Sequence, residues 1–356
     1  MGARTARITR DEFLIPPEFC GLDPAEHPAA RVGGARIELI STGDETRLGA
    51  CYQQVPVRLV PPFVFDAEPA SLLYLINLTA GLMDGDGHRV EVTARTGTRA
   101  VVTGQSATRV HPALSTYATQ QWDVLVEDDA CLVVLPGPLI PYRGSRYFQR
   151  GRVELAPRAR LIWGDIWLPG RYERGILSEH FQFERIVQDF EARRAGRLVY
   201  RDRFRWDGPW SAEDANWYFG GELCSASLFV AGPIPEPLPE ADPVLRRSVF
   251  QLDTGEFCVR WCGPPAAVTA DLVYNALRLA ANWTDGPAAP PWFLGSGCLA
   301  PNHWFSPPIE ENAGLNGSAP ALSPASPSER EGVSLFAAEP EGEAGAPDQP
   351  KRIRES

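Results

Sequence analysis

The feature that most constrains the fold of this chain is a repeated pattern of strand, turn and strand with a period of about 30 residues. In the first copy, residues 89–94 alternate polar and apolar side chains, a turn follows at residues 96–97, and the chain continues as Arg-Ala-Val-Val at residues 99–102. The same plan recurs at residues 122–134 and at residues 152–163. Alternation with a period of two is typical of β-strands. One such unit cannot cover its own apolar face, so the repeat predicts strands that stack on their neighbours.

Two arrangements of these strands are compatible with the sequence. Stacked coils give a mainly β fold with a β-helix-like, or solenoid-like, body of stacked sheets, whereas an antiparallel meander places each strand beside the next one along the chain. We expect the stacked arrangement, with a few α-helices added to it. The clearest helical pattern lies at residues 267–283, near the C-terminal end of the folded part. Residues 180–205 fit both periods, and we expect two strands joined near residues 195–196.

Changes in composition divide the 356 residues into three parts. Residues 1–35 mix proline, glycine and charged residues, and we expect a partly ordered N-terminal extension. Residues 36–305 are expected to form the β-rich domain. Residues 306–356 consist mostly of proline, glutamate, serine, alanine and glycine, and such a segment buries too little apolar surface to offset its conformational entropy. We therefore expect this tail to be disordered.

Charge and cysteine usage narrow the possible partners and the compartment. The net charge is −11, whereas a general nucleic-acid binder needs a surplus of clustered basic residues. Lys351 is the only lysine, so almost all basic residues are arginines, whose planar guanidinium groups suit carboxylates at protein interfaces. The most apolar run, residues 71–83, is too short to cross a bilayer, and residues 1–10 do not begin a secretion signal. Scattered cysteines suit a reducing compartment, so we expect a cytoplasmic protein. From the charge and the short apolar run, we expect that it contacts neither nucleic acid nor membrane.

The segment most suggestive of chemistry follows an apolar strand, at residues 80–88. It combines closely spaced glycines with Asp84, Asp86 and His88. Glycine at positive φ and aspartate bonded to nearby backbone are typical of a tight turn, which is one interpretation. The other is a transient site for a divalent cation, because carboxylate oxygen and imidazole nitrogen are donors of intermediate hardness. Both interpretations stay open on the sequence alone.

The sequence lacks the usual signatures of catalysis. Ser106 is not followed by the second glycine of a nucleophile elbow, and no strand-to-helix transition surrounds it. The five histidines do not show the His-Glu-x-x-His spacing of a catalytic zinc site. A phosphate-binding loop of the Gly-x-x-x-x-Gly-Lys-Ser/Thr type is also missing from the sequence. We therefore expect a protein that is not an enzyme and that acts by binding.

Several motifs occur in a characteristic order. Residues 81–86 read Gly-Leu-Met-Asp-Gly-Asp, and residues 103–109 read Thr-Gly-Gln-Ser-Ala-Thr-Arg. They are similar to a Gly-Leu-Val-Gly-Gly-Asp motif and a Thr-Thr-Gln-Ala-Ala-Thr-Lys motif of one family. Residues 53–59, 163–165 and 198–203 add further matches. Over about residues 36–295 the chain thus resembles the UreD (also called UreH) family of urease accessory proteins, although Asp84 stands where the family motif has glycine.

The resemblance implies a β-helix-like stack that serves as a scaffold for nickel insertion into apo-urease. It also implies a complex with a helical UreF-like accessory protein and a UreG-like GTPase, docked on the apo-urease subunits. No tightly bound cofactor is expected; nickel would be in transit. Asp86 matches the family aspartate, and Asp84, His88 and His111 lie in the same or the adjacent motif segment, so we expect these four residues on a transient nickel path. Weak successive sites suit transfer, because the ion must leave each of them.

A second hypothesis comes from a different class of protein. Paired carboxylates, here Asp84 and Asp86, are the groups that cleave glycosidic bonds in most carbohydrate-active enzymes. The sequence is therefore also compatible with a carbohydrate-active β-solenoid enzyme. Turnover of a polysaccharide would distinguish such an enzyme from a binding scaffold.

Overall fold

The computed structural model describes residues 6–22, 27, 29–43, 45–64, 70–171, 179–234 and 237–283. All of them belong to the first of two units into which the chain divides, residues 1–307. The described residues form two β-sheets and two α-helices, so the predicted mainly β class with a few helices is confirmed. The predicted tail at residues 306–356 lies outside the described residues.

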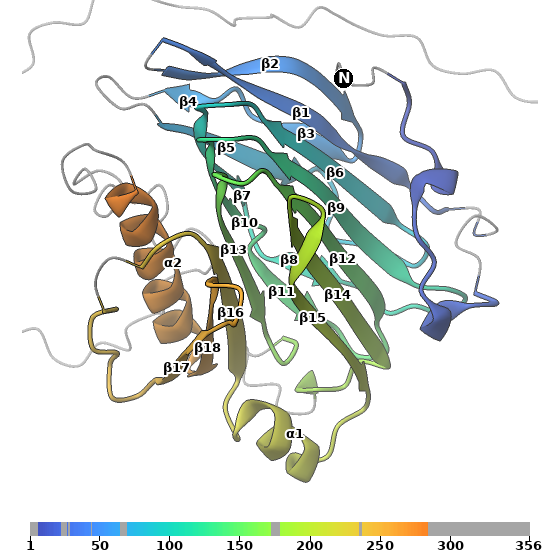
Figure 1. Ribbon diagram of the computed structural model, residues 1–356. Helices are drawn as coiled ribbons and strands as arrows, with labels where there is room; N and C mark the ends of the chain where they lie inside the picture. The colour runs from blue at the N-terminus through green and yellow to red at the C-terminus, as the bar shows by residue number, and fades with distance from the viewer. Residues whose placement is uncertain are drawn as a thin grey trace, which may run out of the picture. The chain divides into compact units, whose positions relative to one another are not determined.

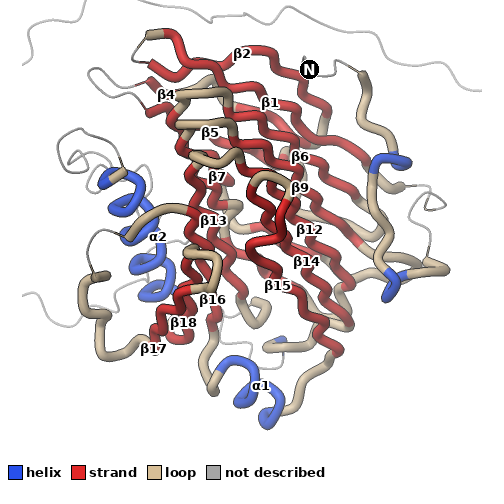
Figure 2. The backbone as a smooth tube through the Cα atoms, in the orientation of Figure 1, coloured by secondary structure: helices blue, strands red, loops and turns tan. Residues whose placement is uncertain are grey.

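Among the described residues, one sheet has seven strands and the other has eleven (Figures 1 and 2). The order in the seven-stranded sheet is β15 (Arg197–Asp207), β14 (Arg185–Arg194), β12 (Arg146–Leu155), β9 (Ala118–Val126), β6 (Gly87–Ala94), β1 (Val32–Thr42) and β2 (Glu45–Gln54). The main path of the eleven-stranded sheet is β17 (Arg246–Gln251), β18 (Phe257–Gly263), β16 (Cys224–Ala231), β13 (Arg160–Trp167), β10 (Cys131–Leu135), β7 (Arg99–Gly104), β5 (Ala70–Asn77) and β3 (Val57–Leu59). The short strand β4 (Phe63–Val64) pairs with β5, and β11 (Pro138–Pro141) pairs with β13 and with β8 (Thr108–Val110).

The predicted repeat corresponds to strands that pair in parallel. From β5 to β14 the main strands alternate between the sheets, with β5, β7, β10 and β13 in one and β6, β9, β12 and β14 in the other. In the second set, Val90 lies beside Trp122, which lies beside Gly151. Parallel pairing excludes the antiparallel meander for this part of the chain. The two sheets are not closed into a single surface, and a solenoid is not confirmed.

The main core lies between the inner faces of the two sheets. Trp122 of β9 packs edge-to-face on Trp163 of β13, with ring centroids 5.6 Å apart. The ring of Phe190 in β14 also packs on Trp163, with centroids 5.0 Å apart. Gly151 makes room for these rings, because a Cβ at this position would lie 2.6 Å from Phe190 Cδ2. The period-two alternation of the repeat thus places large rings from both sheets in one layer.

The helix α1 (Ala212–Phe219) precedes β16 in the sequence, and the helix α2 (Pro265–Asn282) follows β18. The helix α1 begins after Ser211, whose hydroxyl accepts a hydrogen bond from the Asp214 N–H. The helix α2 overlaps the helix predicted at residues 267–283, and it packs its apolar side on the eleven-stranded sheet, away from the seven-stranded one (Figure 1). Neither described helix combines the length and the hydropathy that a crossing of the lipid bilayer requires.

The strands β14 and β15 confirm the prediction for residues 180–205. They pair antiparallel along most of their length. The link between them is made by Ala195 and Gly196, whose φ angles are 49° and 77°. Both values lie in the left-handed region, which closes a tight hairpin.

Residues 6–22, here called the N-terminal segment, lie along the outer face of the seven-stranded sheet (Figure 1). The segment contains two short 3-10 helices, η1 (Arg10–Glu12) and η2 (Pro17–Phe19). The first strand, β1, begins at Val32, within the stretch that we expected to be an N-terminal extension.

Candidate functional site

Asp86 lies in the turn that leads into β6, and its side chain is fully buried. Its Oδ1 accepts a hydrogen bond from the Arg31 N–H at 2.8 Å, and its Oδ2 accepts one from the Met83 N–H at 2.9 Å. Gly85 precedes it with a φ of 80°, a backbone conformation that favours glycine. The Asp86 carboxylate is therefore held by two backbone groups, in agreement with the turn interpretation.

Asp84 fixes a second loop to the same turn. Its Oδ2 accepts hydrogen bonds from the N–H groups of Leu114 and Ser115, at 2.9 and 2.7 Å. Its Oδ1 accepts one from the Thr116 N–H at 2.9 Å. His27 Nε2 lies 3.8 Å from Oδ2. The carboxylate thus joins the loop before β9 to the loop before β6. Its contacts are those of a structural residue and not those of a catalytic acid or nucleophile.

His88 points into the interior between the two sheets. It lies in β6 on the same face as Val90 and Val92, and it is 2% exposed. Burial lowers the pKa of its imidazole to about 4, so the ring is neutral at pH 7. Its Nε2 is buried and has no hydrogen-bond partner among the described residues. A neutral ring with an unpartnered nitrogen is the form in which histidine binds metal ions.

His111 follows β8 and has different surroundings. Its Nε2 lies 3.3 Å from the Ala80 carbonyl oxygen, and its ring contacts the ring of Tyr142 edge-on, with centroids 5.1 Å apart. The four residues predicted for a metal path therefore lie in neighbouring loops and strands, but their side chains do not converge. Within the described ranges, no group of three or more histidine, cysteine, aspartate or glutamate side chains is arranged to hold a metal ion.

A cavity of about 50 Å³ lies beside His88, between the two sheets. Polar residues from both sheets and their loops contribute to its lining: Asn77, Thr79, Gln105, Ser106, Thr108 and Gln120. Trp122 also lines it, and its Nε1 is buried without a hydrogen-bond partner in the described part of the chain. Unpartnered polar groups around a polar cavity of this size are suited to a small polar guest.

A chain of polar side chains, half-buried at Gln120 and buried beyond it, leads from this cavity through the core. Tyr147 Oη lies 3.3 Å from Oε1 of Gln120, which lines the cavity, and 3.3 Å from Oε1 of Gln149. Gln149 Nε2 donates to Asp165 Oδ1 at 2.6 Å, and Trp163 Nε1 donates to Asp165 Oδ2 at 2.8 Å. The strands β9, β12 and β13 therefore carry a continuous polar path inside an apolar core.

Asp165 is the buried acid of this path. Burial raises the pKa of its carboxyl to about 6, the hydrogen bonds that it accepts oppose the rise, and the charge of Asp202 adds to it. Asp202 accepts a hydrogen bond from Arg260 Nη2 at 2.7 Å, and the same nitrogen donates to Tyr200 Oη at 3.1 Å. The carboxyl of Asp165 therefore ionises closer to neutral pH than an ordinary aspartate does.

Sequence reasoning did not identify the members of this polar path. Gln120 and Gln149 occupy inward positions of β9 and β12, and Asp165 occupies an inward position of β13. Asp165 stands two residues after Trp163, and Gln120 stands two residues before Trp122. A polar residue at the apolar phase of an alternating strand is the signal that could have found them.

Comparison with known proteins identifies the family. The family model described as "UreD urease accessory protein" matches residues 31–293. The urease accessory protein UreD of Natronomonas pharaonis is 39% identical over 168 residues, which are 46% of this chain and 54% of that protein. The urease accessory protein UreD 2 of Synechococcus sp. is 30% identical over 214 residues, which are 58% of this chain and 76% of that protein. UreD 3 of Methylorubrum populi is 35% identical over 187 residues, or 51% and 60% of the two chains.

The chain spans about half the length of the Natronomonas relative that it matches. The names of these relatives describe accessory proteins and not enzymes, as the sequence led us to expect. The hypothesis of a carbohydrate-active enzyme is not supported, because the relatives have a different role and backbone N–H groups hold both of the paired carboxylates. Since the family match covers most of its residues, this chain belongs to the UreD urease accessory protein family.

Proposed function

We propose that this chain takes part in nickel insertion into apo-urease, as a cytoplasmic scaffold that works with UreF-like and UreG-like partners and conducts the ion. The observation that carries the proposal is the buried side chain of His88, with its unpartnered Nε2 beside a polar cavity. Neutral imidazole is a suitable ligand for nickel. Because a conduit must release the ion, one such nitrogen with weak oxygen donors around it fits transfer better than a closed cage of ligands.

The buried polar path suggests the route that the ion takes from His88. From His88 the available oxygen donors are Gln120, then Gln149, then Asp165. Asp165 is the anionic member of this series, and its raised pKa means that it can hold a proton in the absence of a cation near pH 6. A cation that arrives would favour the ionised carboxylate. We therefore place the path between the two sheets.

The proposal gives a supporting role to Asp84, Asp86 and His111. Both oxygens of Asp86 and Oδ1 of Asp84 have a second lone pair beside the one that a backbone N–H uses, whereas Asp84 Oδ2 accepts two backbone N–H groups. Their clearest contribution is to fix the turn that positions His88, since Asp86 lies two residues before it. A direct role of these three side chains in binding the ion stays a prediction.

The test is a comparison of His88→Ala with a matched histidine variant. His180→Ala is the control, because burial also lowers the pKa of His180 and its ring does not line the cavity. In a reconstituted system, we expect His88→Ala to reduce urease activation and nickel content by about tenfold or more. Complex formation, followed by size-exclusion chromatography, should stay unchanged. Full activation by His88→Ala at normal complex formation would show that the ion takes another route.

A further inference from the structure

The N-terminal segment contains the same dipeptide twice. Glu12-Phe13 and Glu18-Phe19 begin six residues apart in the sequence. The segment lies outside residues 31–293, which the family match covers, yet it contacts that domain along the outer face of the seven-stranded sheet. In both dipeptides, arginines of the sheet bind the glutamate carboxylate and the glutamate carbonyl.

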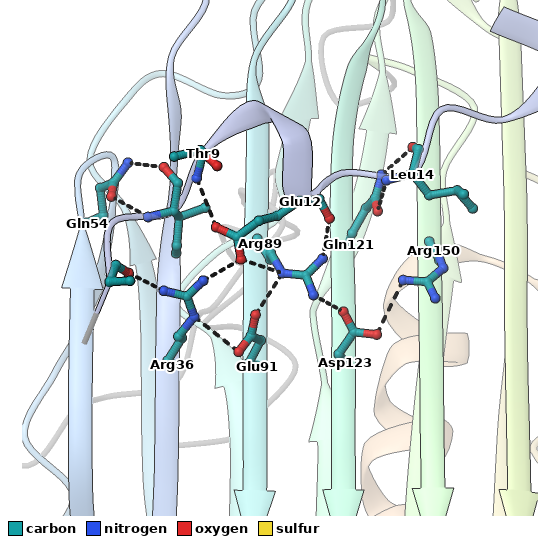
Figure 3. Close-up of polar contacts among 12 residues, drawn as sticks. Thr9, Glu12, Leu14, Arg36, Gln54, Arg89, Glu91, Gln121, Asp123 and Arg150 are labelled. Atoms are coloured by element: carbon teal, nitrogen blue, oxygen red, sulfur yellow. Dashed lines mark hydrogen bonds and ion pairs between the residues drawn. The ribbon is translucent and has the colours of Figure 1, made fainter. Parts of the chain in front are cut away.

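The first dipeptide is bound by arginines of β1 and β6 (Figure 3). The Glu12 carboxylate forms an ion pair with Arg36, and the Glu12 carbonyl accepts a hydrogen bond from Arg89 Nη1 at 2.7 Å. Phe13 is 9% exposed, and the guanidinium of Arg10 lies 5.7 Å from its ring centroid. One arginine thus binds the side chain, a second binds the backbone of the same residue, and a third covers the ring.

The second dipeptide repeats this scheme further along the sheet. The Glu18 carboxylate forms an ion pair with Arg203 of β15, and the Glu18 carbonyl accepts a hydrogen bond from Arg185 Nη1 at 3.0 Å. Phe19 is 1% exposed and stacks on Tyr117, with ring centroids 4.4 Å apart. The guanidinium of Arg185 lies 6.0 Å from the Phe19 centroid. Arginines of the sheet therefore bind the carboxylate and the carbonyl of both glutamates, whereas the guanidinium near Phe13 belongs to Arg10 of the segment itself and the one near Phe19 to Arg185 of the sheet.

Two glutamines of the sheet bind the backbone of the segment as a neighbouring strand would (Figure 3). Gln54 Oε1 accepts from the Ile8 N–H at 2.9 Å, and Gln54 Nε2 donates to the Ile8 carbonyl at 3.0 Å. Gln121 makes the same pair of bonds with Leu14, at 2.9 and 2.8 Å. Contacts of this kind depend on an extended backbone and not on the side chains of Ile8 and Leu14.

Charge complementarity defines what the face accepts. The side chains beneath the first dipeptide form a row in which arginines and acids alternate: Arg36, Glu91, Arg89, Asp123 and Arg150. This row has three positive and two negative groups, and Glu12 supplies the third negative charge. Without an acidic ligand, the row would carry one surplus positive charge; with the segment bound, Arg36 is 2% exposed.

We propose that the outer face of the seven-stranded sheet is a recognition site for an extended segment of a partner protein that carries two acidic–aromatic dipeptides six residues apart. The chain's own N-terminal segment occupies this site as a built-in competitor, which such a partner replaces. The proposal does not depend on the role in nickel transfer, because the outer face and the buried path lie on opposite sides of the seven-stranded sheet.

The test uses the full chain with the segment weakened and the sheet intact. The variant Phe13→Ala/Phe19→Ala removes the two rings, and the probe is a fluorescent peptide with the sequence of residues 6–22, kept under reducing conditions. We expect fluorescence anisotropy to show binding to the variant that is about tenfold or more tighter than binding to the unaltered chain. The reason is that a tethered segment competes at a high effective concentration.

A second peptide, with Glu12→Gln and Glu18→Gln, is the control for the charge. It should bind the variant about tenfold or more weakly, because each exchange removes hydrogen bonds to a charged group. Equal binding of both peptides, equal binding of the first peptide by both chains, or no binding to the weakened chain would each overturn the proposal.

Two further observations keep the test decisive. If circular dichroism shows that the double alanine chain is unfolded, the full chain with Glu12→Gln/Glu18→Gln, which retains both rings, takes its place. A dimer of the unaltered chain that dissociates on addition of the peptide would show that the segment of a second copy occupies the face, and the assignment to a partner would then be wrong.

Discussion

The carboxylates of Asp84 and Asp86 accept hydrogen bonds from five backbone N–H groups, three at Asp84 and two at Asp86. Each of these two side chains therefore holds together loops that are distant in sequence. Asp86 holds Arg31, and Asp84 holds the loop at residues 114–116. Their charge is stabilised by amide dipoles and requires no metal ion.

This arrangement predicts the effect of Asp86→Asn. Asparagine has one acceptor oxygen, whereas two N–H groups converge on the two oxygens of Asp86, so one N–H would meet an NH₂ group. We expect the free energy of unfolding to fall by about 1–3 kcal/mol. Urea denaturation measures this change, with Asp128→Asn at a more exposed turn as the control. An unaltered midpoint for Asp86→Asn would show that the two backbone bonds add little to stability.

At the scale of single residues, the sequence predicts the candidate site only in part. The inward position of His88 can be predicted, because it shares the phase of Val90 and Val92 in an alternating strand. The N–H groups that satisfy Asp84 could not be predicted, because they lie 30 to 32 residues away and meet it only after the sheets have formed. The choice between turn and metal site depends on such long-range contacts.

Among the elements, the strand β12 shows how a glycine can be part of a packed layer. Gly151 lies in the middle of a ten-residue strand, beneath the rings of Phe190 and Trp163. A Cβ would lie 2.6 Å from Phe190 Cδ2 and 3.5 Å from Trp163 Cζ2. The missing side chain is therefore what allows the aromatic layer to close.

We accordingly expect Gly151→Ala to be destabilising, although alanine usually costs less backbone entropy than glycine. Overpacking a well-filled core costs about 1–3 kcal/mol. The control is Leu125→Ala on β9, where the side chain is 42% exposed and its truncation should have a small effect. Thermal unfolding followed by circular dichroism gives both values. An increase in stability for Gly151→Ala would show that the rings can shift to admit a methyl group.

The elements that the sequence predicts well are those whose signal is local. The repeat strands and the helix α2 have regular periods, and the structure confirms them. The start of β1 is different, because Gly33 and Gly34 resemble a loop in composition. Both glycines lie in the strand. A Cβ at Gly33 would clash with the backbone of Gln54 and Val55, and a Cβ at Gly34 would clash with the backbone of Arg89. A close approach of two backbones is not visible in one sequence.

For the whole molecule, the buried polar path joins the two sheets and connects their stability to pH. Burial raises the folded-state pKa of Asp165 from its usual 3.8 to about 6. Between these values the folded protein binds a proton that the unfolded chain has released. The contribution of Asp165 is therefore most favourable at low pH, declines as the pH rises from about 4 to about 6, and is constant above that range.

The difference between the unaltered chain and Asp165→Asn isolates this contribution, since all other ionisable groups are common to both. We expect the difference in free energy of unfolding to shift in favour of the variant as the pH rises, by at most about 1.4 kcal/mol per pH unit. Urea denaturation at several pH values between 4 and 7 measures it. A difference that does not vary with pH would mean that Asp165 titrates at its ordinary pKa in the folded protein.

The binding site of the N-terminal segment has a consequence for the order of events during synthesis. Glu18 is synthesised 185 residues before its partner Arg203. At about 5–20 residues per second, translation of that stretch takes roughly 10–40 s. The segment is therefore made well before its binding site is complete. During that interval, its two acidic–aromatic pairs are exposed to any finished copy nearby.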